Sequence, residues 1–351
     1  ADMILSTTCY IRLNRFSRFT PRDFQNELLQ MSKQSLSELI IDLRDNTGGL
    51  LSAAVNILDM LVDKDLPLVS TKGRTKESNR AFFSKRDPII SKDVKIIVLI
   101  NEGSASASEI VAGAIQDLDR GLVIGKKSFG KGLVQTAYEI DKKRTIKITT
   151  ARYYIPSGRF IQKRDYVDEK FLLNKAVEDS LFKTKKGRIV YSNGGITPDS
   201  SVSDMTMDVI TSQFWRKGYF YSFAQKNKHL YENFDQVQKD PMIINKFIDF
   251  TKGKNDLTLP GKKELSQLEK DLYDLDSSNV SIKKAVKQIS EFYDAKIEEK
   301  SLAESEDMKE ILFLEFAGLF NGPKGRIEQS FKTDNMLKTA IDIISDQYLY
   351  S

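Results

Sequence analysis

The chain has 351 residues, a length that suggests about two domains. Hydrophobic residues make up 40% of it and charged residues 29%, which is typical of a globular protein that buries its own core. The 54 basic and 49 acidic side chains leave a net charge of +5, too weak a bias to indicate a nucleic-acid-binding protein. The single cysteine, Cys9, and the single histidine, His229, exclude a disulfide framework, a multi-cysteine metal site and chemistry that needs two imidazoles.

Neither a membrane span nor a signal peptide is expected. The sequence has no run of about 18 apolar residues. Its first residues also lack the basic segment and apolar stretch of a secretory signal. Because the chain starts abruptly in a strand-like segment, we interpret it as an excised fragment.

Residues 1–202 alternate strand-like and helical segments. The run Ile96–Ile100 is apolar at every position, which is typical of a strand buried on both faces. Strands alternating with helices predict an α/β core. Strands are expected at 9–13, 39–43, 94–100, 122–125, 133–140 and 145–155, and helices at 21–34 and 50–63.

From residue 203 onward the strand signal fades. Apolar residues three and four apart, for example in 263–274 and 282–299, predict an all-helical C-terminal domain over 203–351. The polar, glycine-containing segment 183–195 is expected to be a loop near the join.

Three short motifs could carry chemistry, and the first is the sequence DLRDNTGG at 42–49. A predicted strand ends there in a polar turn with Gly48 and Gly49, and a helix follows. Paired glycines can present bare N–H groups to an anion or a developing oxyanion. The alternative is a tight strand-to-helix turn without a ligand.

The second motif is NEGSASASE at 101–109, which follows the strand 94–100 and opens a helix. A serine at such a junction lies at the positive end of the helix dipole. The alternative is helix capping, because Ser106 and Glu109 also fit a capping box. Spacing does not choose among Ser104, Ser106 and Ser108.

The third motif places Lys131 between Gly130 and Gly132, just before a predicted strand. A free lysine has a pKa of about 10.4 and is a poor base at neutral pH, but burial can lower that value. The alternative is a basic turn on a hairpin, and the order of glycine and lysine does not match a phosphate-binding loop. A nucleophilic serine needs a base, and His229 is expected on a solvated surface, so a Ser/Lys pair becomes the candidate.

With these residues in place, the chain resembles the carboxyl-terminal processing, or tail-specific, proteases. The resemblance implies a protease core of mixed sheet and helices, with a crotonase-like or ClpP-like β-superhelix. The matching segments occur in the family's order at 40–62, 98–117, 129–136, 150–162 and 194–199.

The resemblance implies a role for individual residues. Ser106 would be the nucleophile, Lys131 the general base, and Gln135 would orient the lysine. The oxyanion hole would be formed by the N–H group of Ala107 together with the N–H group of either Gly49 or Gly48. Asp117 matches the acidic residue at the end of the serine helix and would give structural support.

Two departures from the family pattern are visible. Thr47 stands where the family has proline or glycine. No PDZ-like stretch lies between the first strand and residue 39, which predicts that the PDZ domain is absent from this chain.

The resemblance predicts a serine endopeptidase that cuts extended or unfolded polypeptides near their C-terminus through an acyl-enzyme. It implies no metal or organic cofactor and a periplasmic or cell-envelope location. The helical domain lies outside the resemblance, and its open roles are to form a dimer, to cap the active-site cleft or to dock an adaptor. Two rival hypotheses are a catalytically silent peptide-binding module and a hydratase-like or thioester-handling enzyme.

Overall fold

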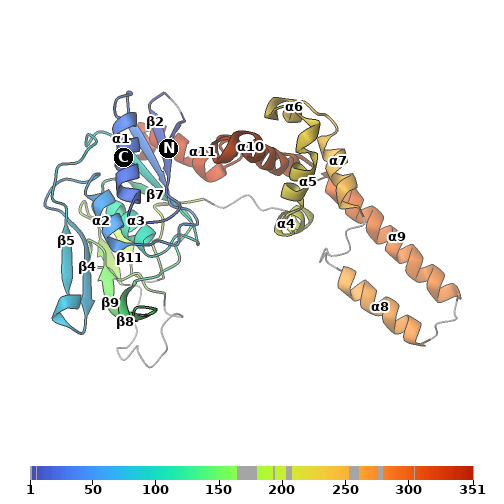
Figure 1. Cartoon of the computed structure of the whole chain (residues 1–351), viewed down its shortest axis with the longest axis horizontal. Helices are drawn as coiled ribbons and strands as arrows, with labels where there is room; N and C mark the ends of the chain where they lie inside the picture. Colours follow the sequence, from blue (N-terminus) through green and yellow to red (C-terminus); the bar gives the residue numbers. More distant parts are fainter. Residues whose placement is uncertain are drawn as a thin grey trace. The chain divides into compact units, whose positions relative to one another are not determined.

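A computed structural model of the chain describes residues 2–4, 6–163, 180–192, 194–202, 208–252, 261–275, 280–303 and 305–350 (Figure 1). The chain forms two compact units, each with its own buried apolar cluster. The first unit is Ala1–Asp204 together with Asn335–Ser351, and the second is Met205–Asp334.

A six-stranded sheet forms the centre of the first unit. β1 is antiparallel to β2, and all the other neighbouring pairs are parallel. The two central strands are apolar throughout their middles and buried on both faces, as the sequence predicts. In spatial order the strands are β1 (Asp2–Met3), β2 (Thr8–Arg12), β3 (Glu38–Asp42), β6 (Lys95–Ile100), β7 (Leu122–Gly125) and β12 (Ser200–Ser201).

Three helices pack in the same apolar cluster as this sheet. They are α1 (Thr20–Met31), α2 (Leu51–Leu58) and α3 (Ala107–Asp117), and α2 contacts both of the others. Figure 1 shows all three beside the strands. Helix α3 is buried along its whole length, and it consists mostly of small and apolar residues, with Glu109, Gln116 and Asp117 as its large polar ones.

A second, antiparallel sheet has the order β5 (Arg80–Phe83), β4 (Pro67–Gly73), β9 (Arg144–Tyr154) and β8 (Leu133–Asp141). A short helix, η1 (Lys76–Ser78), lies between β4 and β5 in sequence. Strands β4 and β5 were not predicted from the sequence, since Pro67, Ser70 and Lys72 interrupt the apolar pattern of β4. The predicted loop at 183–195 is wrong in part, because β11 (Ile189–Tyr191) lies within it and pairs with β10 (Leu181–Lys183).

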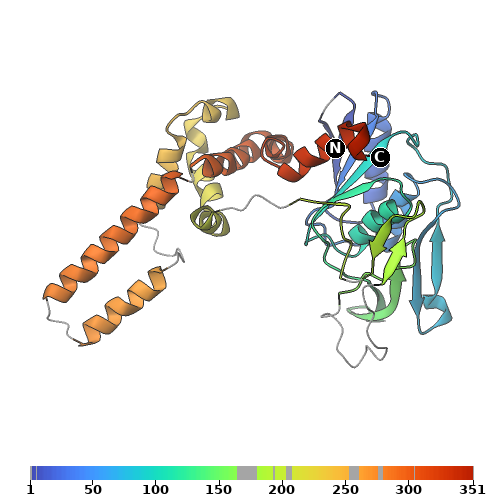
Figure 2. The ribbon, with the colours of Figure 1, turned by 180° about the vertical axis from the view of Figure 1, so that it is seen from behind.

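The last two helices, α11 (Asn335–Ser345) and α12 (Gln347–Tyr350), belong to the first unit. Lys95 Nζ donates to the Ile344 carbonyl at 2.6 Å. The Tyr350 hydroxyl accepts from the Ile96 N–H at 2.8 Å and lies 3.1 Å from the Ile96 carbonyl. Figure 2 shows the two helices, in red, against this unit. The predicted helical domain, 203–351, therefore extends beyond the second unit, which ends at Asp334.

The second unit is helical. Its core is aromatic, with the rings of Phe220 and Phe247 stacked at 4.6 Å between centroids. The predicted α/β class with a helical C-terminal region is thus confirmed. The helices are α4 (Val209–Arg216), α5 (Tyr219–Asn227), η4 (Lys228–Leu230), α6 (Phe234–Gln238), α7 (Ile243–Thr251), α8 (Lys262–Leu275), α9 (Val280–Ala303) and α10 (Ser305–Ser330), which bends at Gly322 and Pro323.

A buried carboxylate closes the end of β3. Asp42 accepts from the Tyr10 hydroxyl at 2.6 Å and from Arg44 Nη2 at 2.7 Å. Burial alone would raise the pKa of Asp42, but the hydrogen bonds and charge of Arg44 overcome it and hold that pKa below its ordinary value.

Asp42→Asn should destabilise the protein at neutral pH by an amount that shrinks in acid. A carboxyl whose pKa is lowered by folding stabilises the fold above its ordinary pKa of about 3.9 and loses that contribution as pH falls through the folded pKa. Urea unfolding of the two proteins between about pH 6 and pH 2 measures the difference. A difference that is constant over this range would contradict the prediction.

Ile344→Ala should destabilise the first unit by about 2–5 kcal/mol, because the Ile344 side chain is fully buried. Ile289→Ala on α9, where the side chain is 48% exposed, is the control and should change stability by less than about 0.5 kcal/mol. Circular dichroism follows unfolding, and the fluorescence of Trp215, the single tryptophan, reports on the second unit. An Ile344→Ala protein as stable as the control would show that α11 is dispensable for the first unit.

Candidate active site

The three motifs meet at one edge of the main sheet. Parallel strands end at a common edge, and ligand sites of α/β proteins collect there. Main-chain hydrogen bonds of 3.0 Å join the loops, from Ala105 N–H to the Asn46 carbonyl and from Phe129 N–H to the Ser104 carbonyl. The loops are residues 43–50 after β3, 101–106 after β6 and 126–132 after β7.

The structure distinguishes among the three serines that spacing left open. Ser104 Oγ is buried and donates to the Leu43 carbonyl at 2.8 Å. Ser108 Oγ is also buried and donates to the Asn46 carbonyl at 2.7 Å. Ser106 alone is partly exposed, so it is the serine of the motif whose hydroxyl a substrate could reach.

Ser106 is the N-cap residue of α3 and has a left-handed backbone, with φ 56° and ψ −112°. Such a conformation costs a serine about 1–3 kcal/mol and persists only where its surroundings impose it. The capping interpretation is confirmed, since Ser106 and Glu109 form a capping box in which the Glu109 carboxylate accepts from the Ser106 N–H.

The carboxylate of Glu109 ties the serine loop to the lysine loop. Its Oε2 atom accepts from the N–H groups of Ser106 at 2.8 Å and Lys131 at 2.9 Å. Its Oε1 atom accepts from Gly130 N–H at 2.7 Å and from Ser128 Oγ at 2.6 Å. Burial raises the pKa of Glu109, and these four donors oppose the increase.

Tyr153, near the end of β9, makes a second connection between the same two residues. Its buried hydroxyl lies 2.6 Å from the Lys131 carbonyl and 3.2 Å from the Ser106 carbonyl. From the sequence, Glu109 was predicted to have only a capping role, and no role was predicted for Tyr153. The signal that could have found Tyr153 was a tyrosine near the end of the predicted strand 145–155, since a tyrosine hydroxyl usually finds a partner when it is buried.

Lys131 is partly buried, and the glycines on both sides of it are held by hydrogen bonds. Gly132 N–H donates to Gln162 Oε1 at 2.8 Å, and the Gly130 carbonyl accepts from Lys163 N–H at 2.9 Å. The Nζ atom of Lys131 has no hydrogen-bond or ion-pair partner among the residues that the structure describes. The main chains of Ser106 and Lys131 are therefore brought together, whereas their side chains are not hydrogen-bonded to each other.

Gln135 is not brought to Lys131 by any hydrogen bond. It is exposed on β8, next to a bulge between Val134 and Gln135 that shifts the pairing with β9. A bulge changes the direction in which the following side chains point.

Gly48 and Gly49 differ in whether their N–H groups already have a hydrogen-bond acceptor. Gly48 N–H donates to Asn46 Oδ1 at 2.9 Å, so it is already used. Gly49 N–H and Ala107 N–H donate to no other residue in the described parts of the chain. Gly48 still shapes the site, because a Cβ atom on it would lie 2.8 Å from the Ser106 Cβ and 2.9 Å from the Ala107 nitrogen.

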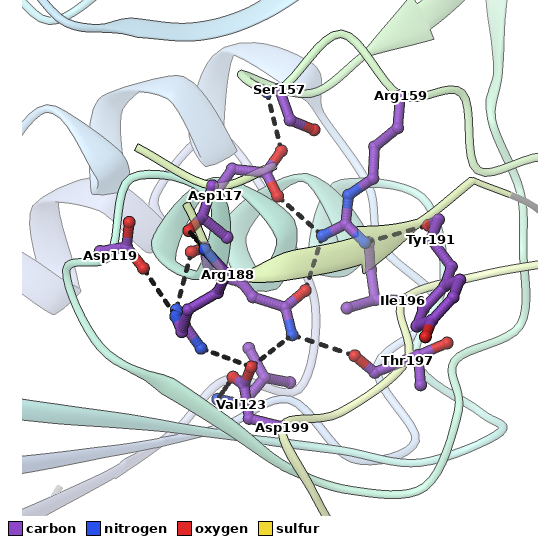
Figure 3. A network of polar contacts seen from close by, with 12 residues as sticks. Asp117, Asp119, Val123, Ser157, Arg159, Arg188, Tyr191, Ile196, Thr197 and Asp199 are labelled. Carbon is purple, nitrogen blue, oxygen red and sulfur yellow. Dashed lines mark hydrogen bonds and ion pairs between the residues drawn. The ribbon is translucent and has the colours of Figure 1, made fainter. Parts of the chain in front are cut away.

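Asp117 lies at the far end of α3, in a network of buried polar contacts (Figure 3). Its carboxylate accepts from Arg159 Nη2 at 2.8 Å and from Ser157 N–H at 2.9 Å. Arg188 joins the same network through Asp119 and Asp199. Asp117 thus fixes α3 to the segments that carry Ser157 and Arg159, and it hydrogen-bonds to neither Ser106 nor Lys131.

Other classes of site find no support in the described residues. His229 is exposed in η4 of the second unit, as predicted. Within the ranges given above, no three side chains among His, Cys, Asp and Glu are grouped as metal ligands would be. Each helix there is too short or too polar to cross a lipid bilayer.

Comparison with known proteins shows what this part of the chain is similar to. Residues 7–169 match the family model described as peptidase family S41. The chain is 39% identical over 155 residues to the chloroplastic C-terminal processing peptidase of Tetradesmus obliquus, which is 44% of this chain and 32% of that protein. It is 43% identical over 157 residues to the carboxy-terminal-processing protease of Bartonella bacilliformis, again 44% of this chain and 36% of the relative.

Among solved structures, the photosystem II D1 C-terminal processing protease is 31% identical, with a TM-score of 0.43, over 57% of this chain and 44% of that one. The match spans about a third of the length of each of the two curated relatives named above. The sequence match covers the strands and loops that build the site described above. Over residues 7–169, which are less than half of the chain, the sequence is therefore similar to peptidase family S41 and to C-terminal processing proteases.

Proposed function

We propose that this chain is a serine endopeptidase that cuts extended polypeptides near their C-terminus, with Ser106 as nucleophile and Lys131 as general base. The observation that carries the proposal is the shared carboxylate. Glu109 Oε2 binds the N–H groups of both residues, so a partly exposed serine and a lysine whose amine has no partner among the described residues belong to one connected site. The match to peptidase family S41 supports the same assignment.

In the proposed reaction, neutral Lys131 takes the proton of Ser106 Oγ as that oxygen attacks the scissile carbonyl carbon. The lysine then gives the proton to the leaving amine, and water hydrolyses the acyl-enzyme. Gln135 is included as the group that orients Lys131, on the strength of the family resemblance and its place four residues further along.

For the oxyanion hole we propose the N–H groups of Gly49 and Ala107. Both are without an acceptor among the described residues, whereas the Gly48 N–H is bound to Asn46 Oδ1. Two preorganised donors of this kind stabilise the charge that develops on the carbonyl oxygen. Gly48 then contributes by leaving room beside Ser106 rather than by donating.

Polypeptide substrates are supported by the strand that follows Lys131. β8 is an edge strand of its sheet, so one side of its backbone is open to pairing. An extended peptide can add to such an edge as a further strand. Exposed apolar side chains on β8 and β9 offer contacts to it, namely Tyr138, Ile140, Ile146 and Ile148.

The proposal also concerns the cellular location of the whole protein. The resemblance to exported proteases supports a periplasmic or cell-envelope location, which cell fractionation tests.

The second candidate function is a catalytically silent peptide-binding module, and the lack of a hydrogen bond from Lys131 Nζ to Ser106 favours it. Labelling by a serine-directed acylating probe separates the two, since only a competent site activates Ser106.

Ser106→Ala and Lys131→Ala should each lower the cleavage of unfolded casein by at least about 10³-fold, because a nucleophile and its base act as a unit. Lys127→Ala on the same loop is the matched control, since Lys127 is exposed, and it should keep wild-type activity. Circular dichroism verifies that all three variants fold. Full activity of Lys131→Ala would refute the assigned base, and full activity of Ser106→Ala would refute the protease proposal.

Gly48→Ala should lower kcat by about 10²-fold or more, since an added Cβ would push the oxyanion loop away from Ser106. Gly187→Ala is the matched control. Gly187 has nearly the same φ, +92° against +96°, but an added Cβ there meets nothing within 4 Å. The control should lose only the backbone cost of about 1–2 kcal/mol and keep its kcat. Equal kcat values for the two variants would show that the contact at Gly48 does not matter for catalysis.

A further inference from the structure

The hydroxyl of Tyr153 is a buried group that the proposed mechanism does not use. The side chain is 1% exposed, and the hydroxyl lies between two main-chain carbonyls. Lys131 O is 2.6 Å from it and Ser106 O is 3.2 Å from it. A buried phenol needs an acceptor, but these two acceptors belong to the proposed base and the proposed nucleophile.

Tyr153 and Glu109 both bind the main chains of Ser106 and Lys131, but they bind different groups. Glu109 accepts from the N–H groups of Ser106 and Lys131, while Tyr153 faces their C=O groups. Each residue is thus held on both sides of its Cα atom. Ser106 O also accepts from the Ile110 N–H in α3, whereas Lys131 O has only the Tyr153 hydroxyl as a donor among the described residues. The position of Lys131 therefore depends on this hydroxyl more than that of Ser106 does.

We propose that Tyr153 is a positioning residue whose hydroxyl sets the separation of Ser106 and Lys131, so that the lysine amine can reach the serine hydroxyl. This inference rests on the proposed function. Tyr153 touches neither the substrate nor the reacting atoms and acts through the backbone of Lys131.

Two observations agree with this role. Burial, and next the charge of Glu109, raise the pKa of Tyr153 well above its ordinary value, so the phenol is protonated and can donate at neutral pH. The main chain of Tyr153 is fixed as well, since its N–H donates to the Gly132 carbonyl at 3.0 Å. The same residue therefore connects the lysine loop to the strand pair β8–β9.

The next residue along β9 provides a matched control. Tyr154 is partly exposed, packs against Phe160 with ring centroids 5.6 Å apart, and has Lys72 Nζ 5.0 Å from its ring. Successive side chains of a strand point to opposite faces, so Tyr154 points away from the site. Its hydroxyl contacts neither Ser106 nor Lys131.

The experiment compares Tyr153→Phe, Tyr154→Phe and the wild type for kcat, KM and the pH dependence of kcat. Tyr153→Phe should lower kcat by about 10- to 100-fold with KM nearly unchanged, since a displacement of about 1 Å in a reacting group has effects of that size. It should also shift the limb of the pH profile that reports the base, because the surroundings of the Lys131 amine change. Tyr154→Phe should match the wild type in all three measurements.

A purely structural role of Tyr153 would lower the midpoint of thermal unfolding but leave the pH profile unchanged, and that result would overturn the inference. If Ser106→Ala is inactive and Tyr153→Phe has wild-type kcat and pH profile, the inference fails while the protease proposal stands. If Ser106→Ala remains active, the protease proposal itself fails.

A second variant covers the case in which Tyr153→Phe does not fold. A difluorotyrosine placed at position 153 keeps the ring and the hydroxyl but is a more acidic phenol. The proposal expects its kcat to fall at a lower pH than that of the wild type, because the ionised phenol no longer donates. An alkaline limb identical to that of the wild type would contradict the proposal.

Discussion

The arrangement of the candidate site depends on one buried carboxylate. Glu109 is fully buried on α3 and accepts four hydrogen bonds, from the N–H groups of Ser106, Gly130 and Lys131 and from the Ser128 hydroxyl. A buried charge without donors would cost several kcal/mol. The loops after β6 and β7 therefore cannot separate without leaving that charge unsatisfied, and this cost keeps the two loops together.

The same carboxylate explains how a strained backbone persists at Ser106. Its positive φ is unfavourable for a serine, and it is held between the buried helix α3 and the Glu109 carboxylate. The strain leaves the Ser106 side chain partly exposed, while Ser104 and Ser108 are buried by their own hydrogen bonds. The site is thus assembled largely from main-chain groups, which the loop sequences alone do not reveal.

Sequence reasoning found the elements that have strong periodic signals. The run at 94–100 predicted β6 because a strand buried on both faces is apolar at every position. β4 and β5 were missed, since their polar residues hide the alternation. Helix α11 was assigned to the helical domain because an apolar helical face does not reveal which core it will join.

The motifs located the three loops of the candidate site. The choice among the three serines, however, required knowing which serine hydroxyls are hydrogen-bonded to neighbouring loops. That information lies in contacts between residues about 60 positions apart, such as Ser108 with Asn46. The use of Gly48 N–H by Asn46, and the connection of Ser106 to Lys131 through Tyr153, were hidden for the same reason.

The path of the chain has a consequence for biosynthesis. The first unit contains residues from both sides of the second unit, which is therefore an insertion between β12 and α11. Met336 and Ile344 complete the packing of the first unit, so this unit cannot finish folding on the ribosome until residues 335–350 have been translated. During translation of the inserted helices, the nascent first unit therefore waits with part of its core uncovered.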